Sequence, residues 1–294
     1  MFRKVSQLCF LIVFAVSTVS FAQNSLDGRP LNPEKDPDID MFMGSWQNSI
    51  PYNTHGAITE RAVFTKSTGD PLKPHKKAAV LKFANRFARA TIDGFDSTTP
   101  TTLRGEQEIF YITSGKGIIK AGGKTHDLYH GIFLLVPANL EFTITNTGDE
   151  LLEMYIINEP IPEGFRPNSE LLVKDENTMP FRNDGYLSVH WSHNGKNVFN
   201  VQDGLGTLEL VNCLTFNAMT IGQPHSHEPG VEEVWAVVEG INLAFLGKEI
   251  RWQYPGTAYM IPPTGFTPHS NINTTEKPIK FLYYARFREH ELRK

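Results

Sequence analysis

Short hydrophobic runs separated by turn residues recur along most of the chain. The runs are rich in Val, Ile, Phe and Tyr and end at Gly, Pro, Asn or Asp, a pattern typical of β-strands. The strands expected from this pattern are 79–83, 108–112, 117–120, 132–136 and 152–157, followed after a gap by 187–191, 207–220, 233–238, 241–246, 258–261 and 279–287. Many short strands at such spacing predict an all-β protein built from sandwiches or barrels.

A proline-rich stretch that begins at Glu159 divides the strands into two groups. The groups are weak copies of each other, because Glu108 lies as far before Gly115 as Glu233 lies before Gly240. Further matched positions are Gly131 with Gly256, Pro137 with Pro262, Phe142 with His269 and Asn146 with Asn273. We therefore expect two tandem copies of one β-domain.

The second copy contains residue types that bind metal ions. His225 and His227 are two positions apart, so in a strand their side chains point to the same face. Glu233 has the same parity, and His269 follows later in the copy. Three imidazoles and one carboxylate suit one divalent transition metal (Mn, Fe, Ni, Cu or Zn) and leave positions open for water or substrate. The adjacent Glu232 is an alternative carboxylate ligand.

These residues resemble the two sequence motifs of the cupin superfamily. The positions of the first motif are filled by His225, His227, Glu233 and Gly240, and those of the second by Gly256, Pro262, Gly265, His269 and Asn273. Extra residues relative to the motifs lie at 228–230, where a Pro-Gly turn can absorb one, and on each side of Gly265. The resemblance implies two tandem cupin barrels of the double-stranded β-helix, or jelly-roll, type. It also implies an N-terminal arm that lends a strand to the neighbouring barrel, and a structural role for Asn273.

The first copy departs from the metal-binding pattern. Its histidine positions, within 101–104, hold threonine or arginine, and Phe142 replaces the third histidine. Phe110 and Phe142 share the parity of Glu108, so they would make the barrel interior apolar. We expect this barrel to bind no metal and to serve as a scaffold and as the contact in a homodimer.

The N-terminal residues have the pattern of a secretory signal. Arg3 and Lys4 precede an apolar run, and Ser20 and Ala22 are the small residues that favour cleavage after residue 22. The run is too short for a comfortable membrane span. We expect a periplasmic or secreted protein with no membrane span after cleavage, and the formal net charge of −4 indicates no nucleic-acid partner. The predicted division is signal peptide 1–22, N-terminal arm 23–77, degenerate cupin barrel 78–158, linker 159–185, metal-binding cupin barrel 186–288 and charged tail 289–294.

Three functions compete. The first is a metal-dependent enzyme (lyase, isomerase, dioxygenase or hydrolase) acting on a small hydroxylated or acidic molecule, such as a sugar acid or a phenolic. The second is a non-catalytic module that binds a carbohydrate or small ligand, and the third is a storage-type bicupin. The complete ligand set weighs against the storage protein, and of the other two we favour the enzyme. We expect Gln223, Trp235 and Asn271 to line the substrate pocket and consider Tyr259 a candidate acid or base.

Overall fold

The structure is a computed structural model in which residues 37–182 and 192–287 are described. The predicted signal peptide 1–22, the start of the arm, the strand expected at 187–191 and the tail 289–294 lie outside the described residues. The described chain consists of strands, turns and the short 3-10 helices η1 (Ile39–Phe42), η2 (Trp46–Asn48) and η4 (Val201–Asp203). The all-β prediction is confirmed.

The first barrel is built from a large and a small sheet. Its strands are β2 (Tyr52–Thr54), β3 (Ile58–Lys66), β4 (Ala79–Leu81), β5 (Arg86–Ile92), β6 (Thr101–Thr102), β7 (Glu106–Ser114), β8 (Gly117–Ala121), β9 (Lys124–Leu128), β10 (Ile132–Val136), β11 (Glu141–Asn146), β12 (Leu152–Pro160) and β13 (Leu172–Asp175). The large sheet has the order β13-β10-β7-β12-β5-β3-β2, with β4 paired to β3. The small sheet has the order β6-β11-β8-β9.

The second barrel repeats this plan. Its strands are β1 (Met43–Ser45), β14 (His193–Asn200), β15 (Leu210–Phe216), β16 (Thr220–Ile221), β17 (Glu232–Glu239), β18 (Asn242–Leu246), β19 (Glu249–Gln253), β20 (Thr257–Met260), β21 (His269–Asn273) and β22 (Ile279–Arg286). The large sheet has the order β1-β20-β17-β22-β15-β14, and the small sheet β16-β21-β18-β19. Within both described ranges, no helix is long and apolar enough to cross a membrane.

Each barrel receives an edge strand from a segment outside its own range. The arm lends a strand, as expected, but β1 pairs antiparallel with β20 of the second barrel and not with the neighbouring first barrel. The connecting segment supplies β13, which pairs with β10 of the first barrel. Strand β3 lies within the range predicted as the arm, yet it pairs along its length with β5 and belongs to the first barrel.

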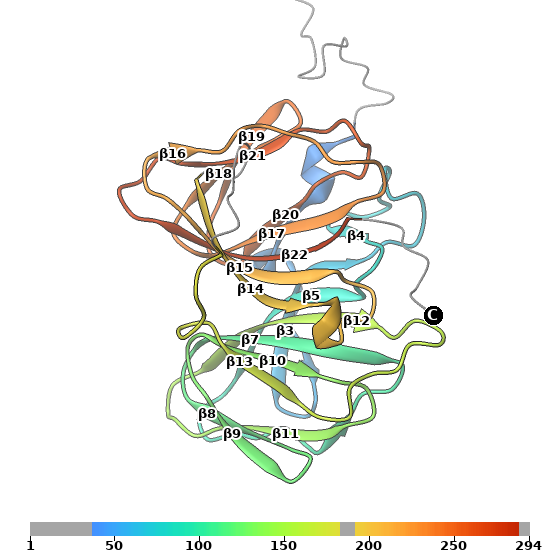
Figure 1. The fold of residues 1–294 in the computed structure, drawn as a ribbon, viewed down its shortest axis with the longest axis vertical. Coiled ribbons are helices and arrows are strands. Elements are labelled where there is room, and N and C mark those ends of the chain that lie inside the picture. Colours follow the sequence, from blue (N-terminus) through green and yellow to red (C-terminus); the bar gives the residue numbers. More distant parts are fainter. Residues whose placement is uncertain (1–36, 183–191, 288–294) are drawn as a thin grey trace, which may run out of the picture.

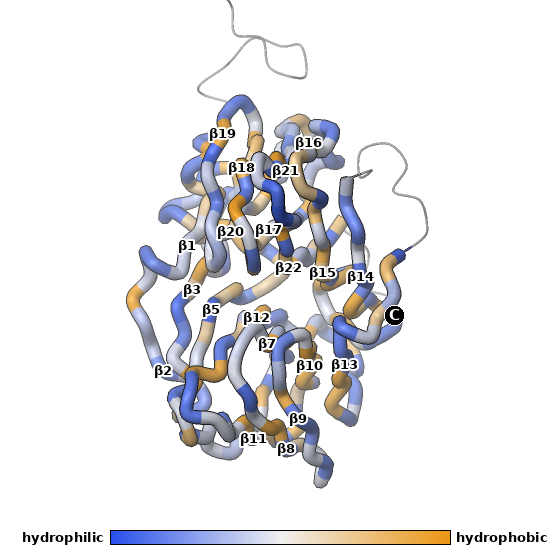
Figure 2. Tube along the Cα trace, turned by 90° about the vertical axis from the view of Figure 1, so that its left-hand side faces the viewer, coloured by the Kyte–Doolittle hydropathy of each residue, from blue (hydrophilic) through white to orange (hydrophobic). Residues whose placement is uncertain are grey.

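The two barrels share a continuous core. Figure 1 shows the second barrel above the first, with their large sheets facing each other, and Figure 2 shows hydrophobic stretches along the strands of both. One cluster of buried side chains lies between these sheets, and each barrel has a further cluster of its own. Phe87 packs edge-on against Tyr284 across the interface, and Tyr155 Oη donates to the carbonyl oxygen of Val237 at 3.2 Å. Strands such as β10 are therefore buried on both faces, which explains their uninterrupted hydrophobic sequence.

Candidate metal centre

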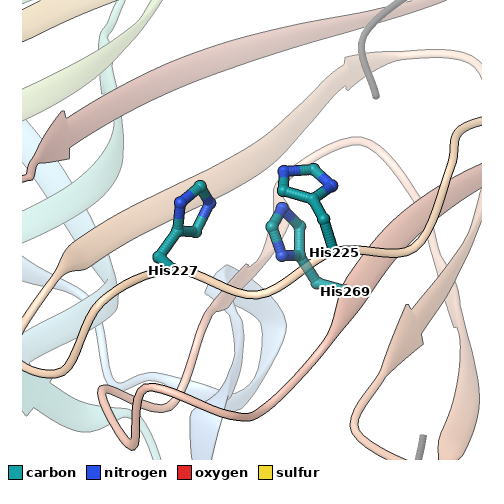
Figure 3. A group of neighbouring side chains, drawn as sticks. All are labelled: His225, His227 and His269. Carbon is teal, nitrogen blue, oxygen red and sulfur yellow. The ribbon is translucent and has the colours of Figure 1, made fainter. Parts of the chain in front are cut away.

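Backbone pairing brings the first and third histidines together. The N–H of His225 donates to the carbonyl oxygen of His269 at 3.2 Å, and the N–H of His269 donates to that of His225 at 2.9 Å. This bridge extends the pairing of β16 with β21. His227 follows two residues later, so its side chain lies on the same side as that of His225. One ring nitrogen from each of the three histidines lies within 4.8 Å of the others, and Figure 3 shows the rings raised toward the same space.

Glu233 completes the cluster. Its Oε2 atom lies 2.8 Å from His227 Nε2, and its Oε1 atom lies 3.3 Å from His269 Nε2. Trp235, two residues further along β17, donates from Nε1 to the same Oε1 at 2.6 Å and fixes the carboxylate. Burial raises the pKa of Glu233, but the imidazoles of His227 and His269 outweigh it and hold that pKa well below its usual range. The carboxylate is therefore ionised.

The alternative carboxylate, Glu232, points to the other face of β17. Its oxygens accept hydrogen bonds from the backbone N–H groups of Lys82, Phe83 and Ala84, at 2.6, 3.0 and 3.3 Å. These residues belong to the first barrel, so Glu232 fastens the two barrels together. The geometry thus places Glu233, and not Glu232, beside the imidazoles.

The arrangement fits a divalent cation. His225 Nδ1 lies 3.0 Å from the carbonyl oxygen of Gln223, which orients the ring. Burial and the nearby His269 lower the pKa of His225 to about 4, so the imidazole is neutral near pH 7, as a metal ligand must be. Both ring nitrogens of His269 are buried without a hydrogen-bond partner among the described residues, while His227 Nε2 and Glu233 Oε2 approach each other without hydrogen-bond alignment. A cation between these atoms would satisfy them.

The remaining predicted residues have distinct environments. Gln223 is exposed and contributes its carbonyl oxygen, whereas Trp235 is buried. Tyr259 is fully buried and its hydroxyl donates to Asn271 Oδ1 at 3.2 Å. Burial raises the pKa of Tyr259 well above its ordinary value. Asn273 donates to the carbonyl oxygens of Asn217 and Lys277, which tie neighbouring turns together.

Several residues near the site are not among those predicted to line it, although His193 lies before the barrel motifs as a possible border of the pocket. The ring of His193 lies 5.3 Å from that of Trp235, and the ring of Phe287 lies 5.7 Å from that of His227, both between centroids. Asn242 and Gln253 are buried inside the same barrel. The parity of Asn242 with Ala244 and Leu246 was the one signal that could have placed its side chain inside.

The corresponding place in the first barrel is filled by the chain itself. Glu108 is buried, and its Oε2 atom lies 3.0 Å from Nε2 of His55, while its Oε1 atom contacts Arg86. The His55 ring packs against Phe142 at 5.6 Å between centroids. Spacing in the sequence favours a solvated surface position for His55, and this is wrong, because its side chain is only 8% exposed.

Comparisons with known proteins agree with this architecture. The cupin domain family matches residues 94–158, which lie in the first barrel and not around the histidines. No curated protein matches the sequence.

Solved structures match most of the chain at low identity. They include a putative glyoxylate induced protein from Pseudomonas aeruginosa (TM-score 0.65, 12% identity, covering 86% of this chain and 90% of that one). Another is the oxalate decarboxylase of Lactobacillus farciminis in complex with formate (TM-score 0.61, 10% identity, 88% and 90% covered). The 7S globulin of Momordica charantia is similar to the same extent (TM-score 0.61, 9% identity, 85% of each chain). At these identities the likeness concerns the fold. The first barrel thus matches the cupin domain family, and the chain as a whole has a bicupin fold with the histidine cluster in its second barrel.

Proposed function

We propose that the second barrel binds one divalent transition metal through His225, His227, His269 and Glu233. The observation that carries this proposal is the convergence of three imidazoles, one ring nitrogen of each lying within 4.8 Å of the others, with an ionised carboxylate beside them. Bound there, such an ion would polarise an oxygen of a ligand or lower the pKa of a bound water.

The proposed activity is that of an enzyme on a small hydroxylated or acidic molecule, such as a sugar acid or a phenolic. In this role the chain orients its ligands: Gln223 fixes the ring of His225 and Trp235 fixes the carboxylate of Glu233. The ligand set suits lyase, isomerase, dioxygenase or hydrolase chemistry. Support for a small acid comes from the fold shared with an oxalate decarboxylase that was solved with formate.

A second candidate is a non-catalytic binding protein for a carbohydrate or another small ligand. It is favoured by the state of Tyr259, the predicted acid or base. Its hydroxyl is fully buried, donates to Asn271 and has a pKa well above its ordinary value, so it is not poised to exchange a proton. Turnover of a substrate by the metal-loaded protein separates the two candidates.

The proposed location is the periplasm or the exterior of the cell. The support is the basic, apolar and small-residue order within residues 1–22, which lie outside the described residues. N-terminal sequencing of the exported protein tests this, and a mature chain that begins at Gln23 is the expected result.

Elemental analysis of the purified protein tests the central proposal. About one transition-metal ion per chain is expected, and the His225→Ala and His269→Ala variants should lose it while they keep their folded structure, since the hydrophobic core holds the barrels. Metal-loaded protein is then screened for turnover of sugar acids and phenolics. Full metal content in both variants would refute the ligand assignment.

A further inference from the structure

The interiors of the two barrels differ at equivalent positions. The strand registers align them, since Phe110 lies opposite Leu134 in the first barrel as Trp235 lies opposite Tyr259 in the second. The other aligned pairs are Ile119–Ile144 with Ala244–Asn271, and Gly117–Leu128 with Asn242–Gln253. Where the first barrel has aliphatic side chains or glycine, the second has a phenol and three amides, all buried.

The orientations of the three amides follow from one backbone group. The N–H of Ile272 donates to Asn242 Oδ1 at 3.2 Å, so the amide nitrogen of Asn242 faces the other way. That nitrogen donates to Asn271 Oδ1 and to Gln253 Oε1, both at 2.7 Å. Tyr259 donates to the same oxygen of Asn271. Both neighbours therefore turn their oxygens toward Asn242, which leaves their NH₂ groups available to other acceptors.

These NH₂ groups have no acceptor among the described residues. Gln253 is fully buried, and its Nε2 atom has no hydrogen-bond partner. Asn271 is 2% exposed, and its side-chain hydrogen bonds in the described chain are those that its Oδ1 atom accepts. A buried amide donor without an acceptor costs free energy, and the first barrel avoids this cost with Leu128 and Ile144.

The spare donor of Asn271 lies close to the metal centre, and that of Gln253 lies further along the small sheet, beyond Asn242. Asn271 follows His269 by two residues in β21, so both side chains face the barrel interior about 7 Å apart along the strand. The ring of Tyr259 lies 6.4 Å from that of His269. Opposite Asn271 stands Ala244, whose side chain is smaller than the isoleucine at the equivalent position of the first barrel, Ile119. The amide of Asn271 therefore has more room beside it than Ile144 has.

We propose that Asn271 and Gln253 form a donor subsite for the second oxygen-bearing group of a ligand whose first such group binds at the metal centre. This inference rests on the proposed function. The spare groups are the neutral NH₂ groups of two amides, and an NH₂ group only donates, so they select carboxylate or carbonyl oxygens. The short separation of Asn271 from His269 along β21 restricts the ligand to a small molecule. The class that fits is a short-chain dicarboxylic acid. Asn242 and Tyr259 are positioning residues, because they set the orientation of the two donors.

Calorimetric titration of the metal-loaded protein tests the subsite with matched acids. Succinate is compared with butyrate, and malonate with propionate, so that each pair differs only in the second carboxylate. We expect each diacid to bind at least about tenfold more tightly than its partner. In Gln253→Leu, which installs the first-barrel residue, this preference should disappear while the metal content stays unchanged.

A second variant protects the test against misfolding. Gln253→Glu keeps the size of the side chain and the oxygen that accepts from Asn242, but replaces the spare donor with an acceptor. It should also lose the preference for diacids, and circular dichroism checks that both variants are folded.

The outcomes separate the subsite from the metal proposal. Equal binding of diacid and monoacid, a preference retained in Gln253→Leu, or binding of none of the four acids would overturn the subsite, and the amides would then serve buried water. Absence of metal from the loaded wild-type protein would overturn the proposed function. In that case, if diacids still bound selectively to the wild-type protein and Gln253→Leu abolished that selectivity, the subsite would stand without the proposed metal.

Discussion

His55 Nε2 lies 3.0 Å from Glu108 Oε2, so an imidazole from the N-terminal arm contacts the first-barrel carboxylate that corresponds to Glu233. In the second barrel, the equivalent carboxylate contacts His227 and His269. In the first, Arg86 contacts the other oxygen of Glu108, and Asn158 Nδ2 donates to it at 3.1 Å. Groups of the chain itself therefore compensate the buried charge that a metal ion would otherwise balance.

Removal of the His55 ring should destabilise the first barrel. The His55→Ala variant leaves one oxygen of the buried Glu108 without its neighbour, and we expect a loss of about 1–3 kcal/mol in the free energy of unfolding. Urea denaturation measures this. His75→Ala is the matched control, because His75 is an exposed arm histidine that contacts Thr68. Equal effects of the two substitutions would contradict a special role for His55.

Acid should weaken the first barrel through Glu108. Burial raises the pKa of this carboxyl, but contacts with His55 and Arg86 outweigh it and hold the pKa below the ordinary value of 4.5. A carboxyl whose pKa is lower in the folded than in the unfolded state stabilises the fold above the unfolded value, and that stabilisation is lost as the pH falls through the folded value. Unfolding free energies of wild type and Glu108→Gln, measured near neutral pH and at about pH 3, should therefore converge in acid. A constant difference between them would refute this.

The two adjacent glutamates should have separable effects. Glu233→Gln removes the charge beside the imidazoles and should weaken metal binding, whereas Glu232→Gln should leave it unchanged because Glu232 faces Lys82, Phe83 and Ala84. Glu232→Ala should cost about 1–3 kcal/mol in stability, since it leaves three backbone donors without their acceptor. Metal titration and urea denaturation of each variant check these effects. Loss of metal in Glu232→Gln would reverse the assignment.

Trp235 should support metal binding without touching the ion. Its indole N–H donates to Glu233 Oε1 at 2.6 Å. A phenylalanine at this position keeps an aromatic ring but has no N–H to donate. We expect Trp235→Phe to weaken metal affinity about 10- to 100-fold, the range found for groups that orient ligands. Competition with a chelator measures the affinity, and Trp252→Phe, an exposed change on β19, is the control. Unaltered affinity in Trp235→Phe would show that the hydrogen bond does not position the carboxylate.

Much of the fold and of the candidate site could be predicted from the periodicity of the sequence. Alternating parity placed His225, His227 and Glu233 on one side of the chain, because side chains in extended backbone alternate between faces. The same rule placed Trp235 inside the barrel, whereas the inward orientation of Tyr259 came only from the structure. The internal repeat predicted two barrels because matched glycines, prolines and acidic residues recur in order. These features are local, and short-range backbone geometry is enough to predict them.

The sequence by itself determined two β-barrels and a set of metal-ligand types in the second. Only the tertiary structure decided which groups meet across long separations in the chain. It placed His55 against Glu108, directed Glu232 to the loop at 82–84 and turned the amide oxygens of Asn271 and Gln253 toward Asn242. The physical reason is that parity fixes the face of a strand on which a side chain lies, whereas its partners depend on how sheets pack and on which hydrogen bonds the neighbouring backbone has already taken.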